Sequence, residues 1–210
     1  MILDIHSHRV APYPEGVINP QDLQAEPAEG QAYSFGIHPW DTASEIDEES
    51  WARLAELVRH PQVVAVGECG IDLTKGGPLY RQLQVLKRQI ELSEEVGKPL
   101  VLHCVKGADI ILGLKRDLQP LQPWIIHGFR GKPSLARQLT DKGIFLSFGE
   151  KFNAETVMEM PDDKILAETD DSILTIEEII GNLSEAGNRD LSSSIAANTR
   201  LLIPWTPSGF

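Results

Sequence analysis

Cysteine is scarce in this sequence, and long apolar runs are missing. Cys69 and Cys104 are the only cysteines among the 210 residues, so they cannot form the disulfide framework of a small secreted domain. No stretch approaches the roughly 20 apolar residues needed to cross a bilayer, and the first residues do not form a basic segment followed by an apolar one. We therefore expect a cytoplasmic protein with no membrane partner.

Basic residues are also fewer than acidic ones. The chain has 19 Lys and Arg residues against 31 Asp and Glu residues, which gives a formal net charge of -12. Proteins that hold long polyanions usually do so with many basic side chains that displace counterions. If DNA or a short oligonucleotide is the substrate, we expect it to be weakly bound and held only around a local site. Nothing in the sequence implies an obligate protein partner.

Short apolar runs, by contrast, recur along the chain. Seven of them are bounded by Gly, Pro or polar residues and are too short for a core helix: MILDIH, AYSFGIH, VVAVGE, KPLVLHC, WIIHGF, GIFLSFG and KILAETD. Segments with helical periodicity lie between several runs, as at residues 49–59 and 79–96, and in the tail at 175–183 and 193–203. This alternation predicts an α/β fold with a parallel sheet in a single domain over residues 1–210, either an open doubly wound sheet or a closed barrel.

Polar residues stand at the end of these runs and not at their beginning. They are His6, His8, His38, Glu68, His103, His127 and Asp170. In a closed parallel barrel the carboxyl ends of all strands meet on one face, so residues far apart in sequence converge there. An open sheet binds ligands mainly at one switch point and brings its first and last strands together less easily. We therefore predict a TIM-barrel-like (β/α) barrel.

Residues 10–31 fit the alternation poorly. Pro12, Pro14, Pro20 and Pro27 interrupt this segment, and only residues 16–19 resemble a short strand. The segment is either a loop over one end of the barrel or a reduced strand and helix. We therefore expect a distorted barrel with as few as seven well-formed strands.

His6 and His8 lie two residues apart at the end of a predicted strand, so their side chains point to the same side and can reach one ion. The same spacing also fits a pair of core or surface histidines. Glu68 could be an exposed carboxylate at the end of its strand. If it is buried at the active face of a barrel, it needs a cation, and bridging two metal ions would satisfy both of its oxygens.

His103 and His127 end two successive apolar runs, and each alone could be a hydrogen-bonded core histidine. Asp170 could instead cap a helix that begins near Ser172, and Glu168 should share the face of Asp170. The repetition at successive strand ends favours a metal site. Imidazole and carboxylate ligands accept zinc, manganese and, less readily, magnesium. Six residues could together hold two divalent metal ions: His6, His8, Glu68, His103, His127 and Asp170.

The ordered motifs DIHSH, GIHPW, AVGECGID, LVLHC, IIHGFRG and AETD resemble those of the TatD family of metal-dependent deoxyribonucleases, within the amidohydrolase superfamily of distorted TIM barrels. The resemblance extends from residue 2 to about residue 172, and AANTRLLI resembles the closing helix of the family. It implies a divalent-metal hydrolase.

The resemblance also implies a role for each site residue. His6, His8 and Asp170 would bind one metal ion. His103 and His127 would bind the second ion, and Glu68 would bridge the two. His38 resembles the family histidine that contacts substrate phosphate and is not a ligand.

The chain departs from the family pattern in three places. Residues 10–31 replace the strand and helix that usually precede GIHP. Val105 stands where an arginine is common, with Lys106 next to it, and DSILTIEE enters a helix directly after the AETD motif. These departures concern the rim of the barrel. The resemblance therefore implies metal binding more strongly than it implies nuclease specificity.

The expected reaction is metal-assisted hydrolysis of phosphodiester bonds in DNA, as in an exonuclease-like deoxyribonuclease. Two divalent ions lower the pKa of a shared water, and Asp170 is the candidate general base. His38, Arg130 and either Lys106 or Lys132 would contact the remaining phosphate oxygens. The basic residues could equally be ordinary solvated surface charges.

Other functions remain open on the sequence. An enzyme of the same superfamily that acts on a small ester, amide or phosphoester would use the same metals, and a catalytically impaired homologue would bind metal without turnover. A phosphoesterase family with histidine-rich distorted barrels also begins with an HxH strand, but its further ligand motifs are missing. His60 matches no site motif. Strand parity points Cys69 and Cys104 away from the site, which predicts packing roles.

Overall fold

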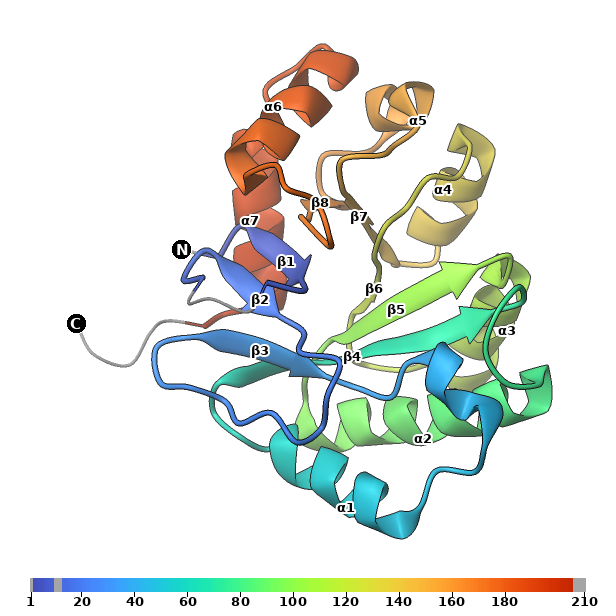
Figure 1. Ribbon diagram of the computed structural model, residues 1–210. Helices are drawn as coiled ribbons and strands as arrows, with labels where there is room; N and C mark the ends of the chain where they lie inside the picture. The colour runs from blue at the N-terminus through green and yellow to red at the C-terminus, as the bar shows by residue number, and fades with distance from the viewer. Residues whose placement is uncertain (1, 10–12, 206–210) are drawn as a thin grey trace.

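The structure is a computed structural model that describes residues 2–9 and 13–205. Eight parallel strands close into a barrel in the order in which they occur along the chain (Figure 1). They are β1 (Asp4–Ser7), β2 (Gly16–Ile18), β3 (Ala32–Phe35), β4 (Val63–Asp72), β5 (Leu100–Val105), β6 (Trp124–Ile126), β7 (Phe145–Phe148) and β8 (Ile165–Ala167). Pairing of β1 with β8 closes the barrel. The predicted TIM-barrel-like fold is therefore confirmed.

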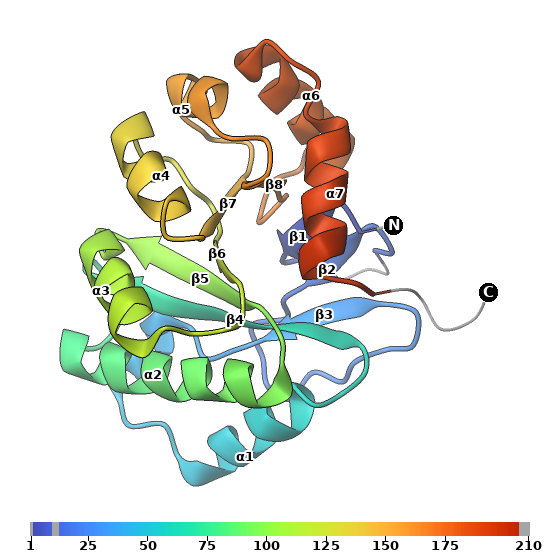
Figure 2. The same ribbon diagram turned by 180° about the vertical axis from the view of Figure 1, so that it is seen from behind.

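The helices lie outside the barrel, as the two opposite views show (Figures 1 and 2). They are the 3-10 helix η1 (Pro39–Ala43) and the α-helices α1 (Glu48–Leu57), α2 (Leu79–Val96), α3 (Ala108–Leu118), α4 (Pro133–Thr140), α5 (Ala154–Glu159), α6 (Ile176–Gly187) and α7 (Ser192–Leu202). The four helical segments predicted from periodicity are α1, α2, α6 and α7. In α2, for example, Val85, Leu86 and Ile90 form the buried face, which packs in the same core as β4. No helix of the described residues is long and apolar enough to cross a membrane.

The floor of the barrel is apolar and lies directly beneath the predicted site. Val101, Ile125 and Leu166 are fully buried in one cluster with Ile5 and Val17. Val101 and Ile125 precede His103 and His127 by two residues, so each apolar residue and the polar one after it point to the same side of the sheet. In β5 and β6 the sequence thus places an apolar layer first and a polar layer at the carboxyl end.

The strand that the sequence left uncertain is formed, and the helix after it is not. β2 pairs with β1 and with β3, which makes eight strands instead of seven. Between β2 and β3, where every residue is described, the chain forms no helix. Two side-chain amides tie this segment to the barrel: Asn19 Nδ2 donates to the carbonyl of Gly67 at 2.7 Å, and Gln31 Nε2 donates to those of Gly16 and Ala32 at 2.8 and 2.9 Å. Of the Pro-rich segment, residues 10–12 lie outside the described part.

The chain after the last strand differs from the expectation in one respect. Residues 171–175 do not enter a helix directly, because α6 begins at Ile176 with a capping box formed by Thr175 and Glu178. Asp170 is therefore not a helix cap, and that alternative is wrong. The closing helix α7 is anchored by Asn198, whose Nδ2 donates to the carbonyls of Asp162 and Ile165 at 2.7 and 2.8 Å.

Asn19 should stabilise the connection between β2 and β3, which contains no helix. Its side chain is 4% exposed, and its amide also donates to the Ser34 carbonyl at 3.2 Å. Asn19→Ala removes these buried hydrogen bonds, which costs roughly 1–3 kcal/mol. We expect urea denaturation followed by circular dichroism to show this loss in the free energy of unfolding. Gln24→Ala, at an exposed position of the same segment, is the control. Equal stability of the two variants would contradict the anchoring role.

Candidate metal centre

The first and last parts of the chain are joined at the carboxyl face of the barrel. His6 lies in β1 and His8 directly follows it. The amide of Asp170 donates to the carbonyl of His6 at 3.0 Å, and the amide of His8 donates to the carbonyl of Asp170 at 3.2 Å. The carboxylate of Asp4 accepts from the amide and the hydroxyl of Thr169 at 3.0 and 2.6 Å. These bonds bring His6, His8 and Asp170 to one corner of the barrel.

The glycines around Glu68 let β4 approach β5 closely. Gly67 has φ +136°, and a Cβ there would lie 2.4 Å from the carbonyl oxygen of Val101. Gly70 has φ +145°, and a Cβ there would lie 2.0 Å from the carbonyl oxygen of His103. The pairing register shifts between Val66 and Cys69. Such an irregularity changes the direction in which a side chain points, and here it accompanies a Glu68 side chain that lies inside the barrel.

Glu68 is the centre of the cluster. Its Oε1 lies 2.7 Å from His103 Nδ1 and 2.7 Å from His127 Nε2. Its Oε2 lies 3.4 Å from His6 Nε2 and 3.7 Å from His8 Nε2. The two oxygens therefore face different imidazoles, which is the placement that a carboxylate shared by two ions requires.

Asp170 and His38 complete the cluster on opposite sides. Asp170 Oδ1 lies 3.4 Å from His8 Nε2 and 4.0 Å from His6 Nε2, so it is on the side of Glu68 Oε2. His38 Nε2 lies 3.0 Å from Glu68 Oε1. Because ligand atoms of His38, Glu68 and His103 lie within 4.8 Å of one another, the position of His38 alone does not separate a ligand from a residue that contacts substrate.

The cluster fits a divalent cation. His6 is fully buried, and neither of its ring nitrogens has a hydrogen-bond partner among the described residues. Glu68 is 4% exposed, and a carboxylate at such a depth needs a positive charge beside it. A metal ion would supply that charge and would occupy a nitrogen of His6 that otherwise stays unpaired. Imidazole and carboxylate together suit zinc and related ions.

The pKa shifts of the buried groups follow from their mutual contacts. Burial raises the pKa of Glu68, but the charge of His127 and hydrogen bonds from His103, His127 and His38 outweigh burial and hold it well below its usual value. Burial and the charge of His127 lower the pKa of His6, which favours the neutral imidazole that binds metals. Burial lowers the pKa of His127, but Glu68 and Glu168 raise it well above its usual value. A cation beside Glu68 would replace the proton that His127 holds.

Two further carboxylates support the imidazoles from behind. Glu168, which the sequence placed on the face of Asp170, is fully buried; its Oε1 lies 3.3 Å from His127 Nδ1 and accepts from the Gly128 amide at 2.6 Å. Asp72 was missed by the sequence analysis: its Oδ2 lies 3.3 Å from His103 Nε2. A carboxylate behind a metal-binding histidine holds the ring in orientation. Strand parity could have identified Asp72, because it lies four residues after Glu68 in β4 and residues an even number apart point to the same side of a strand.

The residues excluded from the site lie apart from this cluster. His60 follows α1, and its Nδ1 accepts from the amide of Gln62 at 3.3 Å. Cys69 is fully buried in the outer core, and its Sγ lies 3.6 Å from the carbonyl oxygen of Val101. Cys104 packs against the same core. The predicted packing role of Cys69 is confirmed, whereas Cys104 packs against the core and also lines a cavity beside His103 and His127.

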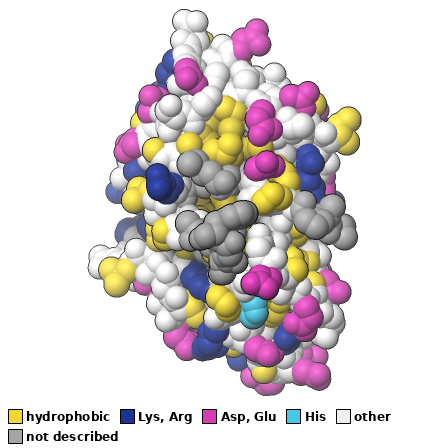
Figure 3. Space-filling model, turned by 90° about the vertical axis from the view of Figure 1, so that its left-hand side faces the viewer, with side chains coloured by type: hydrophobic (Ala, Val, Ile, Leu, Met, Phe, Trp, Pro, Cys, Tyr) yellow, Lys and Arg dark blue, Asp and Glu magenta, His cyan; other side chains and the backbone are white. Residues whose placement is uncertain are grey.

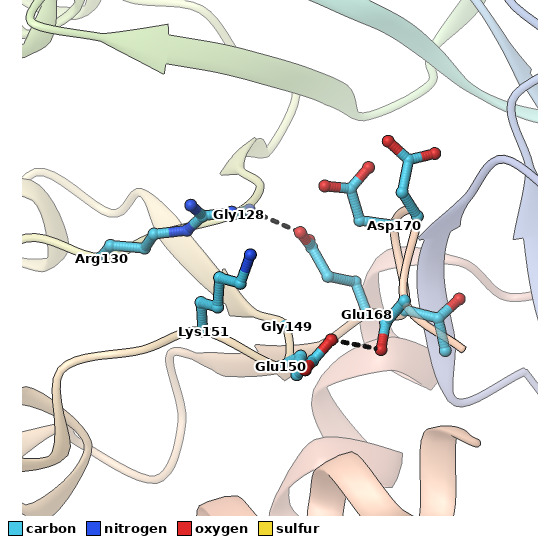
Figure 4. Close-up of a pocket in the computed structure, with 10 residues that line it drawn as sticks. Gly128, Arg130, Gly149, Glu150, Lys151, Glu168 and Asp170 are labelled. Atoms are coloured by element: carbon cyan, nitrogen blue, oxygen red, sulfur yellow. Dashed lines mark hydrogen bonds between the residues drawn. The ribbon is translucent and has the colours of Figure 1, made fainter. Parts of the chain in front are cut away.

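Two cavities open beside the cluster. One of about 560 Å³ is lined by Lys106 and Arg130 together with His103, His127 and Asp170. The other, of about 220 Å³, lies between Arg130 and Asp170. Figure 4 shows Arg130 and Lys151 extending into this second cavity from the side opposite Asp170. Lys106 and Arg130 are exposed and take part in no ion pair among the described residues, so both are available to an anion.

Solved structures confirm the architecture. A TatD homologue from Escherichia coli, YjjV, superposes with a TM-score of 0.76 over 91% of this chain and 86% of its own, at 22% identity. A TatD family hydrolase from Entamoeba histolytica gives a TM-score of 0.70 over 82% of this chain and 74% of its own, at 16% identity. At these identities the likeness concerns the fold.

Curated sequences are closer. The chain is 34% identical over 161 residues to the metal-dependent hydrolase YabD of Bacillus subtilis, covering 72% of this chain and 63% of that protein. It is 32% identical over 158 residues to a protein of Cronobacter sakazakii named 3'-5' ssDNA/RNA exonuclease TatD, covering 68% and 57%. The chain thus spans about three-fifths of the length of these relatives. The model of the TatD related DNase family matches residues 20–181. With its barrel, its histidines and its matched length, the chain belongs to the TatD related DNase family.

Proposed function

We propose that this protein is a divalent-metal-dependent hydrolase that cleaves phosphodiester bonds at the ends of single-stranded nucleic acid, as an exonuclease. The observation that carries the proposal is the position of Glu68, whose two oxygens face different sets of imidazoles in a buried cluster. The name of the C. sakazakii relative supports the choice of substrate. The family supports a hydrolase that uses metal ions.

The donor set divides into two halves. His6, His8 and Asp170 would hold one ion, and His103 with His127 would hold the second. Glu68 would contact both. Divalent ions in such a pair lower the pKa of a bound water and neutralise the phosphate during in-line attack.

Asp170 is the proposed general base. Its side chain is 30% exposed, while those of Glu68 and Glu168 are at most 4% exposed, so it is the carboxylate of the cluster that water reaches most easily. Burial and the neighbouring Glu168 raise the pKa of Asp170. Asp170 also has φ +51°, and its hydrogen bonds to β1 hold this left-handed conformation in place.

The cations of the rim would hold the rest of the substrate. Lys106 and Arg130 line the larger cavity beside His127, where a phosphate oxygen directed away from the ions can reach them. His38 would contact phosphate as well. On the face in Figure 3, Lys and Arg side chains are scattered among Asp and Glu and form no continuous basic surface among the coloured residues. With a net charge of -12, attraction is confined to the site, so substrate binding is weak and local.

Hydrolysis of a small phosphoester, ester or amide is the second candidate. The cavity of about 560 Å³ falls within the range of roughly 300–1,000 Å³ that is usual for small-molecule sites. A catalytically impaired homologue would bind the same metal ions, since all six predicted ligand residues lie in one cluster, and it would hydrolyse no ester or amide. Assays with a generic phosphodiester, a phosphomonoester and a lactone distinguish these functions.

Glu68→Gln should abolish turnover, because a neutral amide cannot balance two ions. We expect kcat to fall by at least about 10³-fold, the scale of losing a central electrostatic contact. Elemental analysis should show less bound metal than in the wild type, while circular dichroism shows an intact fold. His60→Ala is the matched control and should retain full activity. Wild-type activity in the Glu68→Gln protein would refute the shared-ligand role.

Asp72→Asn tests the support behind His103. The substitution keeps the shape of the side chain but removes the charge that orients the ring, so the affinity for Mn²⁺ should fall about 10-fold to 100-fold. Titration calorimetry with Mn²⁺ measures this change. Asp109→Asn, at an exposed position in the first turn of α3, is the control. Wild-type Mn²⁺ affinity in the Asp72→Asn protein would mean that His103 does not depend on this carboxylate.

The acidic surface predicts a preference for ends and a dependence on salt. Initial rates should be higher on single-stranded oligonucleotides than on closed circular duplex, because an end needs little surface to bind. Raising NaCl from about 50 to 200 mM should raise KM, since binding depends on a few local cations. Faster cleavage of closed circles would be incompatible with this substrate choice.

A further inference from the structure

Trp40 is an exposed aromatic residue at the edge of the metal cluster. It follows His38 and Pro39 in η1, and 44% of its surface is exposed. Its ring centroid lies 4.7 Å from that of His38 and 5.7 Å from that of His103, in edge-to-face arrangements with both. A tryptophan with a purely structural role is normally largely buried. The exposure of Trp40 beside the site therefore calls for a functional explanation.

The ring of Trp40 is held in one orientation. Its Nε1 donates to Asp72 Oδ2 at 2.7 Å, and Lys75 Nζ lies 4.1 Å from the ring centroid. Asp72 is fixed in turn, because its Oδ1 accepts from the amide and the hydroxyl of Thr74 at 2.7 and 2.6 Å. A side chain with these contacts has little rotational freedom to lose when a ligand binds it.

The backbone around Trp40 is equally constrained. The loop after β4 packs directly on η1: a Cβ at Gly76 would lie 2.2 Å from the carbonyl oxygen of Pro39, and one at Gly77 would lie 1.9 Å from that of Thr42. The amide of Gly77 also donates to the Thr42 hydroxyl at 3.2 Å. Only glycine permits this approach, so the two segments form one rigid support beneath the ring.

Trp40 shares a cavity with both the reacting and the charged groups. The cavity of about 560 Å³ is lined by Trp40, by the predicted ligands His103, His127 and Asp170, and by the cations Lys106 and Arg130. The rest of its wall includes the apolar side chains of Phe129, Leu135 and Leu139. A ligand that fits this cavity carries an anionic group for the cations and, next to it, a flat and weakly polar group for Trp40 and the apolar side chains. A nucleotide has this combination, since its phosphate adjoins a base.

We propose that Trp40 stacks on a nucleobase next to the scissile phosphate and thereby selects an unpaired end of the strand. This proposal rests on the proposed phosphodiesterase function and specifies how that site recognises its substrate. Stacking on an aromatic ring tolerates any base sequence, because every base has a π-face. It requires the base to be unpaired and unstacked from its neighbour, which a single-stranded end provides and a closed duplex does not. Trp40 would thus be a binding residue that sets specificity without taking part in bond cleavage.

The test compares Trp40→Leu with Trp40→Phe on a single-stranded oligonucleotide. Loss of one base–aromatic contact should raise KM about 10-fold to 100-fold in Trp40→Leu with little change in kcat. Trp40→Phe should remain within a few-fold of the wild type, because it keeps an aromatic ring. Metal content and circular dichroism show whether each variant is loaded and folded. Tyr80→Leu removes another exposed aromatic side chain, which lines a different cavity, and should change nothing.

A second measurement removes the base from the substrate instead of the aromatic ring from the protein. On an oligonucleotide that lacks the base at the 3'-terminal or the penultimate position, the wild type should have a KM as high as that of Trp40→Leu on the normal oligonucleotide. On the abasic oligonucleotide, the KM of Trp40→Leu should be little higher than that of the wild type. Equal KM values for abasic and normal oligonucleotides with the wild type would overturn the proposal.

Failure of the proposal can be separated from failure of the proposed function. An octathymidylate with phosphorothioate linkages, which resists cleavage, should quench tryptophan fluorescence in the holoenzyme and should do so much less in Trp40→Phe. If the wild type cleaves no phosphodiester, the proposed function is wrong, but quenching that depends on Trp40 would still support base recognition. If cleavage is normal and neither quenching nor KM depends on Trp40, only the stacking role is wrong.

Discussion

The whole arrangement depends on the closure of the barrel between its first and last strands. Backbone hydrogen bonds link His6 and His8 to Asp170, and the buried carboxylate of Asp4 binds the amide and hydroxyl of Thr169. Without this junction, groups more than 160 residues apart in sequence would not meet. The junction is itself electrostatically demanding, because burial raises the pKa of Asp4 to about 7 despite its hydrogen bonds. Three hydrogen-bond donors to one carboxylate offset part of that cost.

The buried cluster at the carboxyl face brings together charged groups, and each of them alone would be costly to bury. Glu68 and Glu168 lie at the same depth as His127, and the imidazole between them holds a proton more strongly than usual. Such a cluster gains from a cation, because each carboxylate has an oxygen that faces ligand-type groups and little water. The apolar floor formed by Val101, Ile125 and Leu166 keeps solvent from the lower side. Metal binding is therefore expected to stabilise the folded protein.

The connection between β2 and β3 contains no helix, and hydrogen bonds from side chains hold it against the barrel instead. Asn19 and Gln31 replace part of what a packed helix would do, since their amides bind backbone carbonyls of β2, β3 and β4. On the other side of the site, glycines bring the loop after β4 against η1 and leave Trp40 at the cavity. The two sides of the rim thus differ: one is closed by side-chain amides, and the other presents an aromatic ring and cations.

The order of residues was enough to predict the alternation of strands and helices, the barrel, and the identity of the polar residues at the strand ends. Local patterns carry that information, because side-chain direction alternates along a strand and apolar periodicity marks a helix. Four features required the three-dimensional arrangement: β2 forms, α6 begins at Ile176, Asp72 lies behind His103, and His38 lies 3.0 Å from Glu68. These features depend on register shifts, close approaches at glycine and hydrogen bonds between distant segments. A pattern read along one segment cannot specify them, since each requires the position of a second segment in space.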